Sequence, residues 1–87
     1  MEHTSASEIF DLRRLYYYES GNIFTGSLNN FNYKITPNKD EITAEIWHGA
    51  LFSELAEIEL KKIFKLDEEG FEEMIKWLEN EYKKETD

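Results

Sequence analysis

The chain of 87 residues contains no cysteine, which excludes disulfides, thiol chemistry and cysteine-ligated zinc or iron–sulfur sites. Its four glycines are scattered at positions 21, 26, 49 and 70, so no glycine-rich loop can cradle a phosphate. No apolar run approaches the ~18–20 residues of a membrane span, and no apolar segment of a signal peptide follows Met1. We therefore expect a cytoplasmic protein that does not bind membranes, and the absence of cysteine agrees with a reducing compartment.

Basic residues are scarce, because ten Lys and Arg oppose nineteen Asp and Glu, and the formal net charge is −9. Residues 41–87 carry fourteen acids and six bases, whereas residues 1–40 carry five acids and four bases. Such a surface repels nucleic acid and attracts basic protein surfaces. Arg13 and Arg14, beside three tyrosines, are too few for the usual phosphate contacts. We expect no direct binding to nucleic acid.

Aromatic residues are abundant, at 15% of the chain, and each of them buries ~150–250 Å² in a core. Together with 40% apolar residues, they predict one small ordered domain over 1–87, with frayed ends at 1–7 and 85–87. A domain of this length has a modest core and no room for a deep enclosed active site.

The first expected element is a helix over 8–18. Ser5 and Glu8 have the spacing of a capping box, and Tyr16 falls on the apolar face of the helix. A strand over 15–18 is the alternative, because three consecutive tyrosines favour β structure.

A β-hairpin is expected next, with its turn at Asn29-Asn30, since asparagine tolerates the positive φ of a two-residue turn. This register pairs Gly26 with Tyr33, and an aromatic ring opposite a strand glycine stabilises such a pair. A second turn is expected at 37–40, with Pro37 at its second position.

A third strand is expected over 41–47, with every second residue from Ile42 to Ile46 facing the core. Apolar and charged residues alternate over 58–66, which predicts a fourth strand after a turn near 50–56. A short helix capped by Ser53 is the alternative for the start of this segment.

An amphipathic helix closes the chain, with Asp67 as its N-cap and its end near Lys83 and Lys84. Its apolar stripe consists of Phe71, Met74, Ile75, Leu78 and Tyr82, with Trp77 at the edge. The predicted fold is therefore α+β: an N-terminal helix, a three- to four-stranded antiparallel meander, and a C-terminal amphipathic helix packed on the sheet.

The chain contains four short motifs: Leu-Tyr-Tyr-Tyr at 15–18, Thr-Gly-Ser-Leu at 25–28, Trp47-x-Gly49, and Glu-Glu-Gly at 68–70 followed by Trp77-Leu78. Together they resemble those of small uncharacterised acidic proteins of Gram-positive bacteria. The resemblance covers most of the chain after residue 14. It implies a shared fold and does not assign an activity.

His48 is the only histidine outside the expected N-terminal tail, and Glu45 lies near it in sequence. A histidine–carboxylate pair can act as a general base or as half of a metal site. Here no second histidine has a fixed position, and no G-x-S-x-G nucleophile motif occurs. We predict that the protein is not an enzyme and has no catalytic, metal or cofactor site. A small enzyme or ligand-binding domain centred on His48 is the alternative.

Acidic residues are densest on the last helix, where five fall within ~16 Å, a charge density comparable to that of one DNA strand. Solvated helix surface is the competing interpretation, because Lys76 and Lys83 share this face and the dipole already favours acids in the first turn. The five are Glu68, Glu69, Glu72, Glu73 and Glu79.

Trp47 faces away from the core residues of its strand. It is an exposed interface residue if both helices cover one side of the sheet, and a core residue if they cover both.

The favoured function is a non-catalytic, acidic protein-binding module. Its partner would present a basic surface, as a nucleic-acid-binding protein does, and the module could act as an inhibitor that mimics nucleic acid. A homodimer is compatible with the sequence. The expected partner-binding residues are Glu45, Trp47, His48, Glu69, Glu72 and Glu73.

Overall fold

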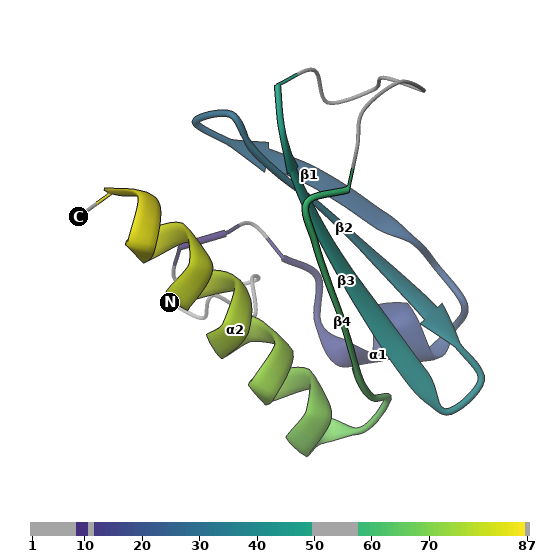
Figure 1. Cartoon of the computed structure of the whole chain (residues 1–87). Coiled ribbons are helices and arrows are strands. Elements are labelled where there is room, and N and C mark those ends of the chain that lie inside the picture. Colours follow the sequence, from purple (N-terminus) through teal and green to yellow (C-terminus); the bar gives the residue numbers. More distant parts are fainter. Residues whose placement is uncertain (1–8, 11, 50–57, 87) are drawn as a thin grey trace, which may run out of the picture.

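The computed structural model describes residues 9–10, 12–49 and 58–86, which form a four-stranded antiparallel sheet and two helices (Figure 1). Each strand pairs with the next in the chain, in the order β1-β2-β3-β4. The predicted α+β fold is confirmed. The elements are α1 (Leu15–Glu19), β1 (Phe24–Leu28), β2 (Phe31–Asn38), β3 (Glu41–His48), β4 (Leu60–Lys65) and α2 (Glu68–Thr86).

Helix α1 is shorter than the helix expected over 8–18, because its regular turns begin only at Leu15. Arg14 at its N-cap makes no side-chain capping bond, and the Ser5–Glu8 capping box lies outside the described residues. The phase of the helix also differs from the prediction: Tyr16 is exposed and Tyr18 is the buried tyrosine. Packing of Ile9, Phe10 and Leu12 against the core has replaced a continuous helix.

The first hairpin has the predicted turn and register. Asn29 and Asn30 have φ of 51° and 69°, and Gly26 pairs with Tyr33. The Tyr33 ring covers Gly26 so closely that a Cβ at this position would overlap the ring. Tyr33 is itself buried, so the glycine opens space for a core tyrosine.

We expect Asn30→Gly to leave the free energy of unfolding unchanged or to raise it by up to about 0.5 kcal/mol, because glycine adopts positive φ without strain. Asn29→Gly is the contrasting variant, since the Asn29 side-chain amide donates to the Tyr82 hydroxyl at 2.8 Å. Loss of this bond should cost about 0.5–1.5 kcal/mol. Urea melts of both variants test these different roles of Asn29 and Asn30. Equal losses in the free energy of unfolding would contradict them.

The second turn lies two residues later than predicted. Pro37 pairs with Ile42 inside the β2–β3 ladder, and the turn consists of Lys39 and Asp40. Strand β1 accompanies β2 only as far as Ile35, so Pro37 lies where β2 has one edge without a neighbour. A missing N–H is tolerated at such a place. Lys39 takes the positive φ of the turn, at 56°.

Strand β4 lies within the stretch where alternation predicts it. The turn expected near 50–56 and the alternative helix capped by Ser53 fall on residues 50–57, which lie outside the described part. Ile42 pairs with Phe64, so these two side chains share one face of the sheet, which we call the core face. Thr43 and Ile63 pair on the opposite face, the second face. Both helices pack on the core face: Tyr18 of α1 contacts Phe71 of α2.

Helix α2 begins as predicted, because the Asp67 carboxylate accepts a hydrogen bond from the Gly70 N–H at 2.7 Å. It runs to Thr86, so Glu85, expected in the frayed end, lies in the helix. The predicted apolar stripe faces the sheet, and the helix runs back alongside the sheet from the end of β4 (Figure 1). The buried core consists of Phe10, Leu12, Tyr18, Phe31, Tyr33, Ile35, Ile42, Ala44, Ile46, Phe64, Phe71, Met74 and Leu78.

The two tryptophans lie on opposite faces of the sheet. Trp77 of α2 packs on the Phe64 ring on the core face, with 6.0 Å between ring centroids. Trp47 pairs with Asn32 on the second face, and its side chain is only 5% exposed. The expectation that one-sided helices leave Trp47 exposed is therefore wrong. Asn32 is also buried and donates to the Gly49 carbonyl at 3.0 Å.

Candidate functional site

The six residues expected to bind a partner do not form one site. Glu45 and Trp47 lie on the second face of the sheet, and His48 lies at the end of β3. The three glutamates Glu69, Glu72 and Glu73 are exposed on α2. Trp47 is buried and cannot contact a partner directly. The remaining candidates lie in three separate places: Glu45 on the second face, His48 at the end of β3, and the glutamates on α2.

Glu45 lies between two lysines. It pairs across the sheet with Lys34 of β2 on one side and Lys61 of β4 on the other. Opposite charges at directly opposed positions stabilise a sheet modestly. This arrangement gives Glu45 a structural role, as the central charge of a row of alternating charges across three strands. Glu45 does not contact His48.

His48 is held between two carboxylates that are distant in the sequence. Its Nδ1 lies 2.9 Å from Oε1 of Glu59, and its Nε2 contacts Oε1 of Glu85 at the end of α2. The backbone N–H of His48 also donates to Oε2 of Glu59 at 2.9 Å. The Phe31 ring stands edge-on to the imidazole. The cluster thus joins the ends of β3 and α2 to the residue before β4.

Two carboxylate partners require a proton on each ring nitrogen, and only the imidazolium form has both. Burial alone would lower the pKa of His48, but the hydrogen bonds and negative charges of Glu59 and Glu85 outweigh it and raise that pKa above its ordinary value. Both ring nitrogens are engaged, which suits a structural ion pair better than a general base.

We expect this cluster to make stability depend on pH. The raised pKa means that the folded state keeps its proton at pH values where the unfolded state has lost it, so stability falls as pH rises. Below pH ~6.5, the free energy of unfolding of wild type should exceed that of His48→Asn by up to about 1 kcal/mol. The gain is limited because the imidazole is 37% exposed and solvent screens its ion pairs. The difference should vanish above the folded-state pKa. Urea melts from pH 5.5 to 9 measure it, and a difference that grows with pH would contradict the assignment.

The outward side of α2 is an acidic surface whose three candidate glutamates form no ion pairs with other described residues. Glu69, Glu72 and Glu73 are exposed, and within the described ranges none of them has an ion pair or a side-chain hydrogen bond. Glu72 and Lys76 are four positions apart on the helix, but they form no ion pair with each other. A charged partner can therefore reach all three carboxylates.

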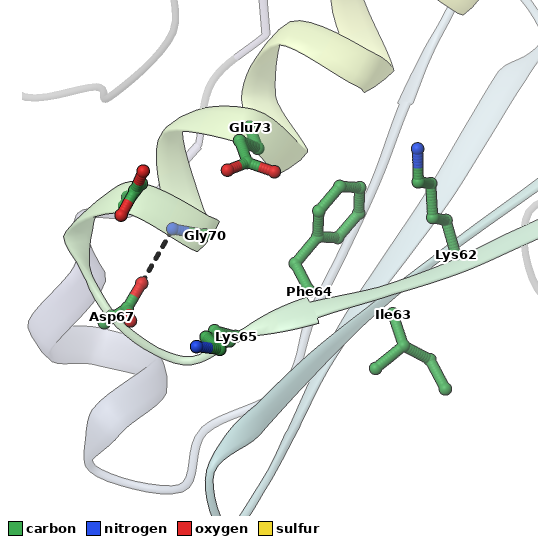
Figure 2. Close-up of a pocket in the computed structure, with 8 residues that line it drawn as sticks. Lys62, Ile63, Phe64, Lys65, Asp67, Gly70 and Glu73 are labelled. Carbon is green, nitrogen blue, oxygen red and sulfur yellow. Dashed lines mark hydrogen bonds between the residues drawn. The ribbon is translucent and has the colours of Figure 1, made fainter.

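A groove lies on the strand side of α2, between its first two turns and β4 (Figure 2). It encloses about 380 Å³. Glu69 and Glu73 line it from the helix, while Lys62, Phe64 and Lys65 line it from β4. The Lys62 ammonium lies 5.5 Å from the centroid of the Phe64 ring. Charges of both signs therefore line this groove.

A second groove, of about 470 Å³, lies between α1 and α2, and we call it the interhelical groove. It brings Glu72 together with Glu68 of α2 and Glu19 of α1. The groove is also lined by Arg14, Leu15, Tyr16, Phe71 and Ile75. The sequence places Tyr16 on the apolar face of the expected helix, so it does not predict this groove.

Neither helix in the described part of the chain is long and apolar enough to cross a membrane. Within the same residues, no three His, Asp or Glu side chains are grouped to hold a metal ion. No family model matches this chain, and neither a curated protein nor a solved structure matches it. Function is therefore inferred from the geometry of the acidic surfaces.

Proposed function

We propose that this protein is a non-catalytic binding module that docks on a basic protein surface through the outward side of α2. The supporting observation is that Glu69, Glu72 and Glu73 are exposed on one rigid helix and have no ion-pair partner among the described residues. Three such charges on a regular element provide both attraction and a fixed geometry.

A nucleic-acid-binding protein is the partner class that this surface suits best. Its basic site is built for closely spaced negative charges, which the first turns of α2 supply along a straight axis. Occupation of that site would make the module an inhibitor that mimics nucleic acid. The lysines of α2 are Lys76, Lys83 and Lys84, so the acidic character is strongest in its first half.

The test is a charge reversal, Glu69→Lys, Glu72→Lys and Glu73→Lys in one variant. Immobilised wild-type protein first captures partners from cell extract at low and high salt, and the binding rates of a purified partner are then measured. The variant should associate more slowly and with a flatter salt dependence, because exposed charges act mainly on the on-rate. Its free energy of unfolding should change by no more than ~1 kcal/mol per site.

The matched control reverses Asp40 and Glu41 at the β2–β3 turn, and the loss of affinity is compared per reversed charge. Equal losses would mean that net charge alone drives binding. If the α2 variant has an unchanged on-rate at low salt, the acidic surface of α2 does not take part in binding.

A further inference from the structure

The interhelical groove has a rim on which glutamates outnumber basic residues. Glu19 of α1 faces the groove together with Glu68 and Glu72 of α2, and Arg14 is the one basic residue that lines it among those the structure describes. In the part of the chain that the structure describes, none of the three glutamates forms an ion pair or a side-chain hydrogen bond. The rim therefore attracts a cation.

The floor of the same groove is apolar. Phe71 is buried there, and Leu15 and Ile75 are partly buried and pack against the core. Tyr16 stands at the rim with 66% of its surface exposed, the largest value among the exposed large apolar side chains described. A long side chain with an apolar stem and a cationic end fits both parts at once.

We propose that the interhelical groove receives an arginine side chain from a basic segment of the partner protein. This inference rests on the proposed function and names where on α2 the partner inserts. The methylene stem would pack on Leu15 and Ile75 while the guanidinium meets the glutamates and stacks on the Tyr16 ring. The same pairing already occurs at the next residue of α1, where the Arg13 guanidinium lies 4.8 Å from the centroid of the Tyr17 ring.

The groove on the strand side of α2 is the weaker candidate for the same ligand. Lys62 and Lys65 line it beside its acidic residues, and they would repel an incoming guanidinium. Glu73 lines that groove and Glu72 lines the interhelical one, so the two neighbouring residues make a matched pair for a test.

The experiment is a site-resolved titration of the full chain with a tetra-arginine amide at low ionic strength. Amide shifts in two-dimensional NMR locate the peptide and give its affinity for each variant. Shifts should concentrate at Leu15, Tyr16, Glu72 and Ile75. Glu72→Gln and Tyr16→Leu should each weaken binding about two- to fivefold, whereas Tyr16→Phe and Glu73→Gln should change it by less.

Thermal melts check that each variant folds, which the exposure of Tyr16 and Glu72 favours. If Glu72→Gln and Glu73→Gln weaken peptide binding equally and Tyr16→Leu does not weaken it, the groove is not the arginine site. The proposed binding through the acidic surface of α2 would then be unaffected. If only Tyr16→Leu and Glu72→Gln weaken peptide binding, the groove is supported as the arginine site. This conclusion holds even if substitutions of Glu69 and Glu73 have no effect on association with the partner. Absence of peptide binding by wild type would also overturn the groove.

Discussion

Leu78→Ala is expected to lower the free energy of unfolding by ~2–5 kcal/mol. Leu78 is fully buried at the centre of the α2 stripe, between the helix and the sheet. The substitution removes three carbon atoms and leaves a cavity that a small core can fill only in part. For a domain whose total stability is of order 5–15 kcal/mol, such a loss is a large fraction.

Urea unfolding monitored by circular dichroism measures the effect of Leu78→Ala, with Lys76→Ala as its control on the same helix. Lys76 is exposed, so its truncation should stay within ~0.5 kcal/mol. A loss below about 1 kcal/mol for Leu78→Ala would show that α2 does not depend on this contact.

Gly70→Ala is expected to destabilise the protein by ~1–3 kcal/mol, although alanine favours helices over glycine by about 1 kcal/mol. A Cβ at Gly70 would overlap the carbonyl oxygen of Lys65 and lie 2.8 Å from the carbonyl carbon and the amide nitrogen of that residue. These are backbone atoms, so no side-chain rotation relieves the overlap. The first turn of α2 would have to move away from the end of β4.

The sign of the Gly70→Ala effect is diagnostic, because the same change at an unobstructed helix position stabilises a protein. Glu69→Ala, in the same turn and exposed, is the control and should lie within ~0.5 kcal/mol. A more stable Gly70→Ala variant would mean that α2 does not approach Lys65 as closely as the structure shows.

Elements with a strong local signal were predictable from the sequence. The Asn29-Asn30 hairpin follows from two residues that tolerate positive φ between alternating flanks, and the observed register agrees pair by pair. The α2 stripe follows from a 3.6-residue period of apolar residues over a long segment. In both cases the residues that fix the structure are close together in the sequence.

Features set by tertiary contacts were not predictable. The helix expected over 8–18 had a weak apolar period, and packing of Phe10 and Leu12 on the sheet shortened it to α1. Pro37 is normally a turn residue, but an edge without a neighbouring strand admits it into β2. Neither outcome can be read from neighbouring residues alone.

The candidate site shows the same division. Exposed glutamates on α2 could be placed from the helical period, which puts them opposite the apolar stripe. The partners of His48 could not be predicted from the sequence, since Glu59 and Glu85 lie 11 and 37 residues away from it. The interhelical groove depends on how α1 packs beside α2, and the sequence carries no signal for that angle.

The separation of the two tryptophans by the sheet makes each a reporter of a different event. Trp77 lies in the contact between α2 and β4, so its fluorescence should change when the helix detaches from the sheet. Trp47, buried on the second face beside Asn32, should respond to opening of that end of the sheet. Single-tryptophan variants, Trp47→Phe and Trp77→Phe, therefore distinguish local detachment of the helix from cooperative unfolding, because coincident transitions from both reporters indicate two-state behaviour.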